Sequence, residues 1–134
     1  MKRAAAYGKK AVIIEGKAYG GTCVNVGCVP KKIMFNAALV SEVLREASNF
    51  GFDAVSPKFH WKALKDSRDT YIKRLNGIYE RGLDNAGVKR IEGWGSIKGA
   101  GTVAVTRDDG SEQVIAADHI VVAVGGRPRH LDVV

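Results

Sequence analysis

Two cysteines, Cys23 and Cys28, are the only thiols among the 134 residues, and four residues separate them. A structural zinc site needs four Cys or His ligands in short paired spacings. The three histidines are scattered, so we expect no metal site. A disulfide that closes so short a loop removes little entropy from the unfolded chain, which argues against a purely structural bond. The remaining interpretations are a redox-active pair and two buried free thiols in a helix.

The spacing favours the redox interpretation. In an ideal helix, residues five apart in the chain are separated by about 7.5 Å along the axis. This exceeds the limit of roughly 6.8 Å between the Cα atoms of a disulfide. A bond between Cys23 and Cys28 therefore requires a distorted turn, and strained, accessible disulfides are the labile, catalytic kind.

The segment 20–32, GGTCVNVGCVPKK, closely resembles the redox-active disulfide motif of the flavin-dependent disulfide reductases, the class I pyridine nucleotide-disulfide oxidoreductases. Its V-P-K-K end is similar to the glutathione reductase branch and to its trypanothione-reducing relatives. The dihydrolipoamide and mercuric branches typically carry Pro-Ser-Lys there. The resemblance extends from about Lys2 to Pro128 and fades over the last six residues. It implies NADPH-dependent reduction of glutathione disulfide through FAD and a Cys23–Cys28 disulfide.

The same resemblance implies roles for individual residues. Cys23 is the interchange thiol that attacks the substrate disulfide, and Cys28 is the thiol against the flavin. Lys31 lies beside the flavin ring, where a cation stabilises negative charge on the reduced flavin. Thr22 and the backbone of Cys23 contact the FAD phosphates or ribityl chain, and the backbone of Gly95 meets the adenine. Nearby lysines also favour thiolate formation.

Tyr79 and Glu15 are two further candidates. Tyr79 matches the tyrosine that lines the glutathione pocket in the family, although core packing is the alternative for a single tyrosine on a helix. Residues 11–15 predict a buried parallel strand that ends in Glu15. In a dinucleotide-binding βαβ unit, such an acid accepts hydrogen bonds from the adenosine ribose. A solvated strand end is the alternative for Glu15.

The family places a G-x-G-x-x-G turn about 20 residues before that acid, and none precedes Glu15 here. Gly8 fits the C′ residue of the helix that would follow the turn. We therefore expect residues 1–134 to be a partial FAD-binding domain that carries the redox-active disulfide, with the NADPH-binding and dimerisation domains absent. The family's catalytic His–Glu pair has no match, because His60, His119 and His130 have the wrong context. The alternatives are a non-catalytic truncated flavoprotein domain and a reductase of a related disulfide such as trypanothione.

Two helical patterns follow the cysteines. Apolar residues recur at three- and four-residue steps over 33–47 and predict a helix that ends near Phe50, with Pro30 in an early turn or kink. A second pattern predicts a helix from Trp61 to about 83–87. We expect the apolar stripes of both helices to be mostly core.

From residue 88 the period of the apolar pattern changes to two residues, which is typical of strands. Residues 88–92 predict a strand, and 93–96 predict a kink where the backbone approaches a ligand. Two strands, 102–106 and 113–116, flank the hairpin signal Asp-Asp-Gly at 108–110. The apolar run 118–124 predicts a buried strand that enters a glycine turn, and this block resembles the A-T-G-G/S-x-P signature of the family. The fold class is α/β: a partial Rossmann-like FAD-binding domain with a parallel central sheet and an added β-hairpin or meander.

The composition of the chain limits which kinds of partner and which compartment we expect. The formal net charge is +7, but no basic helix face is interleaved with base-stacking aromatics, so attraction to anionic small molecules is favoured over nucleic acid. No apolar run reaches 18 residues, so we expect no membrane span. Few cysteines without a secretory signal favour a reducing compartment, the cytoplasm, with a mitochondrial copy as the alternative. The resemblance implies a homodimer for the full-length family.

Overall fold

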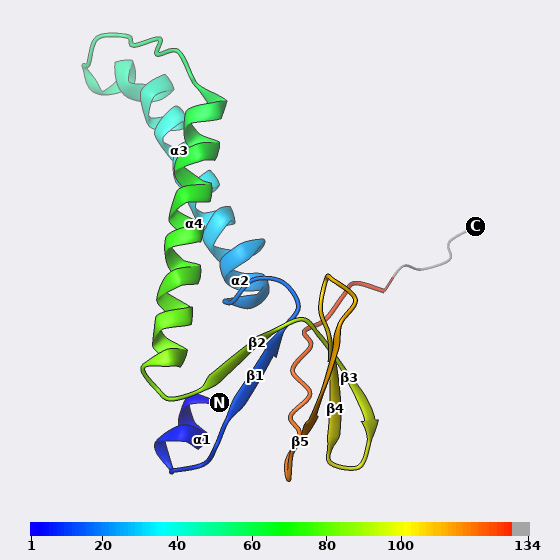
Figure 1. Ribbon diagram of the computed structural model, residues 1–134. Coiled ribbons are helices and arrows are strands. Elements are labelled where there is room, and N and C mark those ends of the chain that lie inside the picture. The colour runs from blue at the N-terminus through cyan, green and yellow to red at the C-terminus, as the bar shows by residue number, and fades with distance from the viewer. Residues whose placement is uncertain (130–134) are drawn as a thin grey trace. The chain divides into compact units, whose positions relative to one another are not determined.

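The computed structural model describes residues 1–129 in two compact units (Figure 1). The first unit combines Met1–Lys17 with the chain from Leu83 onward, and the second is Ala18–Gly82. The first unit holds the strands, and the second holds the cysteines and most of the long helices. The mixed α/β content agrees with the expected partial FAD-binding fold. His130, one of the three histidines considered above, lies outside the described residues.

The first unit begins with the short helix α1 (Lys2–Ala6), which ends as the sequence predicts. The amide of Gly8 donates to the carbonyl of Ala5 at 2.9 Å, and Gly8 adopts a left-handed φ of 75°, the conformation that favours glycine after a helix. Strand β1 (Val12–Glu15) then pairs in parallel with β2 (Lys89–Glu92). The register sets Glu15 opposite Glu92. The parallel pairing confirms the parallel strand expected for residues 11–15, but Val12–Glu15 are half-buried and not fully buried as expected.

A three-stranded antiparallel meander follows β2. Its strands are β3 (Trp94–Gly99), β4 (Thr102–Thr106) and β5 (Glu112–Ala116) in that order. The turn between β4 and β5 closes through Gly110, at φ 80°, which confirms the hairpin. The kink expected over 93–96 is confined to Gly93, at φ 142°. Glycine is required there because a Cβ would lie 2.7 Å from the carbonyl oxygen of Thr106. Residues 95 and 96 belong to β3 instead.

The prediction of a buried strand over 118–124 is wrong. This segment has no regular secondary structure, and Val124 is 88% exposed. Apolar and β-branched residues favour a strand only where a neighbouring strand offers unpaired backbone groups. In residues 1–129, β1 and β2 pair with each other alone, and β5 pairs with β4. Residues 118–124 pair with none of these strands, so their apolar composition alone does not make them a strand.

The second unit is a helical hairpin preceded by the redox segment. It contains α2 (Gly21–Asn25), α3 (Cys28–Glu46), the 3₁₀ turn η1 (Ala47–Phe50) and α4 (Trp61–Asp84). The long helices α3 and α4 lie side by side (Figure 1). Their boundaries confirm both helix predictions, and Pro30 lies in the first turn of α3.

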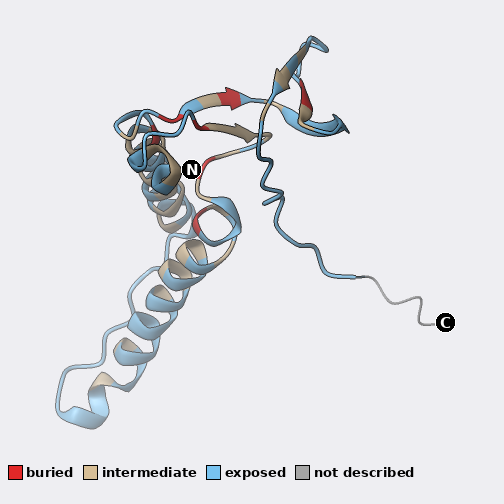
Figure 2. Cartoon of the chain, turned by 90° about the horizontal axis from the view of Figure 1, so that it is seen from below, coloured by how far each residue is buried: buried red, intermediate tan, exposed pale blue. Residues whose placement is uncertain are grey.

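The expected core stripes of these helices are, however, largely exposed. Figure 2 shows α3 and α4 mostly in the colour of exposed residues, and apolar side chains such as Phe35, Val40 and Val43 are among them. In this unit the buried residues are Tyr19 and Val24, beside the redox segment. Packing therefore fixes the base of the hairpin, where the cysteines lie, more firmly than its tip.

The stretch Gly21–Phe50 is long and apolar enough, by length and composition, to cross a membrane. This differs from the expectation drawn from the sequence. Core helices of soluble proteins pass the same test, and the stretch is interrupted at Val26–Gly27 between α2 and α3. The absence of a membrane span stays a prediction.

Candidate redox site

A break between two helices separates the two cysteines. Cys23 lies in the middle of α2, and Cys28 is the first residue of α3. Between them the chain leaves the helical conformation, with φ −137° at Val26 and φ −122°, ψ −113° at Gly27. This is the distorted turn that the five-residue spacing requires, so the fold brings within reach two thiols that a continuous helix would hold apart.

Gly27 permits this break because the backbone of α2 passes directly over it. A Cβ at Gly27 would lie 2.8 Å from the carbonyl oxygen of Thr22 and 3.2 Å from the Cα of Cys23. Real Cβ atoms do not approach a backbone oxygen so closely. The absence of a side chain at this position thus sets the distance between α2 and the start of α3.

We expect Gly27→Ala to hinder formation of the Cys23–Cys28 disulfide, because the added methyl group must push α2 away from Cys28. Thiols are counted after equilibration of the chain in a mild oxidant. The variant should retain about ten times more free thiol pairs than the unmodified chain at the same oxidant strength, for a displacement that costs on the order of 1.4 kcal/mol. Gly99→Ala is the control, since nothing lies within 4 Å of its added Cβ. Equal oxidation of all three chains would contradict this role of Gly27.

Both cysteines are exposed free thiols in this structure, and they interact with each other. A hydrogen bond between their side chains is the largest effect that raises the pKa of Cys23 above its ordinary value, followed by desolvation. The charge of Lys31 acts in the opposite direction. The lysine therefore favours the Cys23 thiolate as expected from the sequence, but the neighbouring thiol outweighs it. The pair fits a redox-active disulfide.

Removing the neighbouring thiol should make Cys23 more reactive. In Cys28→Ala the main cause that raises the pKa of Cys23 is gone, so a larger fraction of Cys23 is thiolate at neutral pH. The rate of alkylation of Cys23 by iodoacetamide at pH 7 should increase relative to the reduced, unmodified chain, and its pH profile should shift to lower pH. Lys31→Ala should shift the profile the other way. A profile unchanged in Cys28→Ala would show that the two thiols do not interact.

Two asparagines that the sequence analysis did not single out brace the redox segment. The side-chain amide of Asn76, on α4, donates to the carbonyl oxygen of Tyr19 at 2.7 Å and to Oδ1 of Asn25 at 2.8 Å. The amide of Asn25 donates in turn to the carbonyl of Gly21 at 2.9 Å. Asn25 and Asn76 are 51 positions apart in the chain. Only Asn25 lies within the cysteine motif at 20–32.

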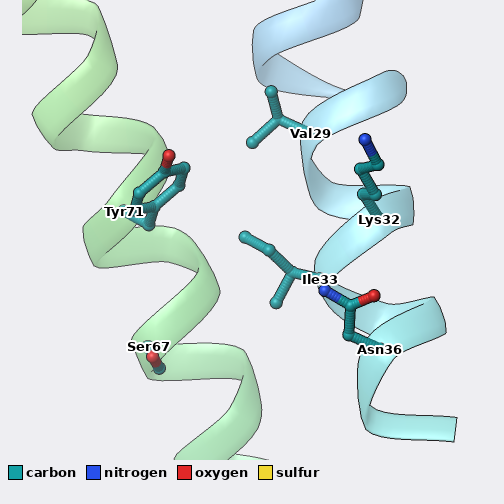
Figure 3. Close-up of a pocket in the computed structure, with 6 residues that line it drawn as sticks. All are labelled: Val29, Lys32, Ile33, Asn36, Ser67 and Tyr71. Atoms are coloured by element: carbon teal, nitrogen blue, oxygen red, sulfur yellow. The ribbon is translucent and has the colours of Figure 1, made fainter. Parts of the chain in front are cut away.

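The remaining residues predicted for the second unit lie on the same hairpin. Thr22 and Lys31 are exposed near the cysteines, and Tyr79 is 44% exposed on α4. Lys32, an exposed residue of α3, lines a cavity of about 380 Å³ between α3 and α4. Its other lining residues are Val29, Ile33, Asn36, Ser67 and Tyr71, with Val29 and Ile33 pointing from α3 toward α4 (Figure 3).

In the first unit, Glu15 lies at a polar cavity. The cavity has a volume of about 500 Å³ and opens at the carboxyl ends of β1 and β2, the position where parallel sheets bind nucleotides. Its lining includes both strand-end carboxylates and the cation of Arg107; the lining residues are Glu15, Gly16, Lys17, Glu92, Gly93, Arg107, Asp108 and Asp109.

Within this cavity, Oε1 of Glu15 accepts a hydrogen bond from the amide of Lys17 at 3.0 Å. Its second oxygen is available to a ribose hydroxyl, so the residues present fit the adenosine end of FAD. Gly95 is not part of the lining, although Gly93 is. The contact of Gly95 with adenine therefore stays a prediction.

The predicted site residues are thus divided between the two units. Glu15 and Gly95 belong to the first; Thr22, Cys23, Cys28, Lys31 and Tyr79 belong to the second. Among residues 1–129, no group of three His, Cys, Asp or Glu side chains could hold a metal ion. The second unit carries the thiols, and the first carries the strand-end carboxylate of Glu15.

Comparison with known proteins agrees with this chemistry. The family model described as pyridine nucleotide-disulphide oxidoreductase matches residues 1–134. A glutathione reductase of Yarrowia lipolytica is 50% identical over 141 aligned positions, which cover 98% of this chain and 30% of the relative. The chain therefore spans about a third of the length of that curated relative. The family uses FAD and NAD(P)H. By the match over its whole length and by its pair of thiols, the chain belongs to the pyridine nucleotide-disulphide oxidoreductases.

Proposed function

We propose that this chain is the disulfide-bearing part of an NADPH-dependent glutathione-disulfide reductase. The observation that carries the proposal is the break between α2 and α3, which brings the thiols of Cys23 and Cys28 into contact at an exposed position. The 50% identity to a glutathione reductase supports the choice of substrate.

Two thiol–disulfide exchanges make up the reaction of this chain. The thiolate of Cys23 attacks one sulfur of glutathione disulfide, the substrate S–S bond breaks, and one glutathione leaves and takes up a proton. Cys28 then attacks the Cys23 sulfur of the mixed disulfide and releases the second glutathione. The two thiols are oxidised to one disulfide and the substrate is reduced by the same two electrons.

FAD supplies the electrons that return the Cys23–Cys28 disulfide to the dithiol, with NADPH as their source. Glu15 would hold the adenosine ribose, and Thr22 with the backbone of Cys23 would hold the phosphate or ribityl region. Lys31 places a positive charge for the flavin ring, and Gly95 would offer its backbone to the adenine. Tyr79, on the helix next to the redox segment, would contact glutathione.

The rest of the proposal concerns the whole protein. It is a homodimer that acts without nucleic acid or membrane, in the cytoplasm or, as the alternative, in mitochondria. Residues 1–134 form part of the FAD-binding domain, and the segments that bind NADPH and form the dimer come from elsewhere in the protein. The excess of positive charge favours the anionic substrate and cofactors.

A chimera tests the proposal. In Yarrowia lipolytica glutathione reductase, the aligned 30% of the chain is replaced by residues 1–134, giving what we call the reductase chimera. It should retain bound flavin and oxidise NADPH when glutathione disulfide is added. Activity with trypanothione disulfide or lipoamide, but not with glutathione disulfide, would overturn the substrate assignment. A folded chimera that holds flavin and reduces no disulfide would favour the alternative, a non-catalytic flavoprotein domain.

A further inference from the structure

The two asparagines that brace the redox segment form a small hydrogen-bond relay, and its direction is fixed by backbone groups. The carbonyl oxygens of Tyr19 and Gly21 can only accept hydrogen bonds. The side chains that face them, Asn76 at 2.7 Å and Asn25 at 2.9 Å, must therefore present their NH₂ groups. This orientation leaves Oδ1 of Asn25 to accept the second N–H of Asn76 at 2.8 Å. Every polar contact in the relay is consistent with one assignment of the two amides.

The relay connects α2, the short helix that carries Cys23, to α4, the helix that carries Tyr79. Asn25 lies two residues after Cys23, in the same short helix, and three residues before Cys28. Asn76 lies three residues before Tyr79 on α4, so their side chains share one face of that helix. Both asparagines are half-buried, and Tyr19 between them is buried.

A helix of five residues such as α2 does not hold its own position, because so few backbone hydrogen bonds cannot offset the cost of forming a helix. Gly20, just before α2, and Gly21, its first residue, are both at positive φ and add backbone freedom. The relay attaches this segment to the 24-residue helix α4. The position of the Cys23 thiol relative to Cys28 therefore depends on the two amides.

We propose that Asn76, acting through Asn25, is a positioning residue for the thiol chemistry: it holds Cys23 where Cys28 can close the disulfide. The inference rests on the proposed function for its biological role, but it can be tested apart from that function. Without the relay, the first exchange still forms a mixed disulfide between Cys23 and glutathione. The second exchange becomes less favourable as well as slower, because the effective concentration of the Cys28 thiol at the Cys23 sulfur falls.

The test equilibrates the 134-residue chain in buffers of reduced and oxidised glutathione, quenches with acid, and separates dithiol, mixed disulfide and intramolecular disulfide by mass. The unmodified chain should pass directly from dithiol to intramolecular disulfide. In Asn76→Leu and Asn76→Asp, which both remove the donor, the ratio of intramolecular to mixed disulfide should fall about tenfold, as expected for the loss of two hydrogen bonds. Asn25→Leu should do the same, and the double variant should fall no further, because the residues act as one network.

Asn36→Asp is the matched control, since Asn36 lies on α3 and its side chain makes no hydrogen bond in the described part of the chain; its ratio should stay that of the unmodified chain. Circular dichroism reports the helix content of every variant. An unchanged ratio in an Asn76 variant that keeps its helix content would overturn the proposal.

A second measurement in the reductase chimera covers variants that lose helix content in the isolated chain. There, Asn76→Asp should lower kcat about tenfold and change the KM for glutathione disulfide by less than about twofold, because the substrate contacts are kept while ring closure is impaired. A rise in KM with unchanged kcat would assign Asn76 to substrate binding instead. If the chimera is inactive the proposed function fails, and the redox-buffer result still decides the role of Asn76.

Discussion

Cys23→Ser in the reductase chimera is expected to abolish reduction of glutathione disulfide, by at least about 10³-fold in kcat, while the flavin remains bound. A serine hydroxyl is not ionised at neutral pH and forms no sulfur–sulfur bond, so the first exchange cannot take place. The side chain is exposed, so the substitution does not disturb packing.

The companion variant Cys28→Ser separates the two steps of the reaction. It should also fail to turn over, but after reduction it should react once with glutathione disulfide and retain one glutathione on Cys23, visible as a mixed disulfide by mass. NADPH consumption and intact mass are measured on the same samples. Turnover that persists in Cys23→Ser, or glutathione trapped on Cys28 in place of Cys23, would reverse the assignment of the two thiols.

Glu15→Ala in the reductase chimera is expected to weaken FAD binding by about 10- to 100-fold, for the loss of one charge-assisted hydrogen bond of about 1.5–3 kcal/mol. The carboxylate lies at the end of β1 and lines the polar cavity, with one oxygen already held by the amide of Lys17. That bond fixes the side chain in place, so the second oxygen is positioned for a ribose hydroxyl.

Glu92→Ala is the control, because Glu92 ends the neighbouring strand in register with Glu15 and lines the same cavity. Removing either carboxylate changes the charge near the anionic cofactor equally, but only Glu15 is assigned to the ribose. Release of flavin on dilution, followed by fluorescence, gives the dissociation constant of each variant. Equal weakening in both would mean that the cavity acts through its charge and not through a specific bond of Glu15.

The features that the sequence predicts correctly are those that depend on a few neighbouring residues. Gly8 after α1 and Gly110 in the hairpin occupy the left-handed conformations that their motifs demand, because the energy that selects glycine there is a property of a few neighbouring atoms. The break between Cys23 and Cys28 is also a local feature, since a disulfide across this spacing would require it.

Interactions between distant segments could not be predicted in this way. The bond between Asn25 and Asn76 joins residues 51 positions apart, and nothing in either local pattern identifies the partner. The error at 118–124 has the same origin: its composition favours a strand, but a strand forms only where its backbone pairs with that of another segment. The pKa of Cys23 likewise depends on which way the neighbouring thiol points, so Lys31 alone gave an incomplete expectation.

The most direct test of the central claim, that Cys23 and Cys28 form a redox-active pair, is the number of glutathione molecules and of free thiols on the folded 134-residue chain across a series of glutathione redox buffers. A redox pair loses both thiols together at one midpoint and carries no glutathione at the oxidised end, and dithiothreitol restores both thiols. Two independent midpoints, with one glutathione added at each cysteine and no intramolecular bond, would contradict the account.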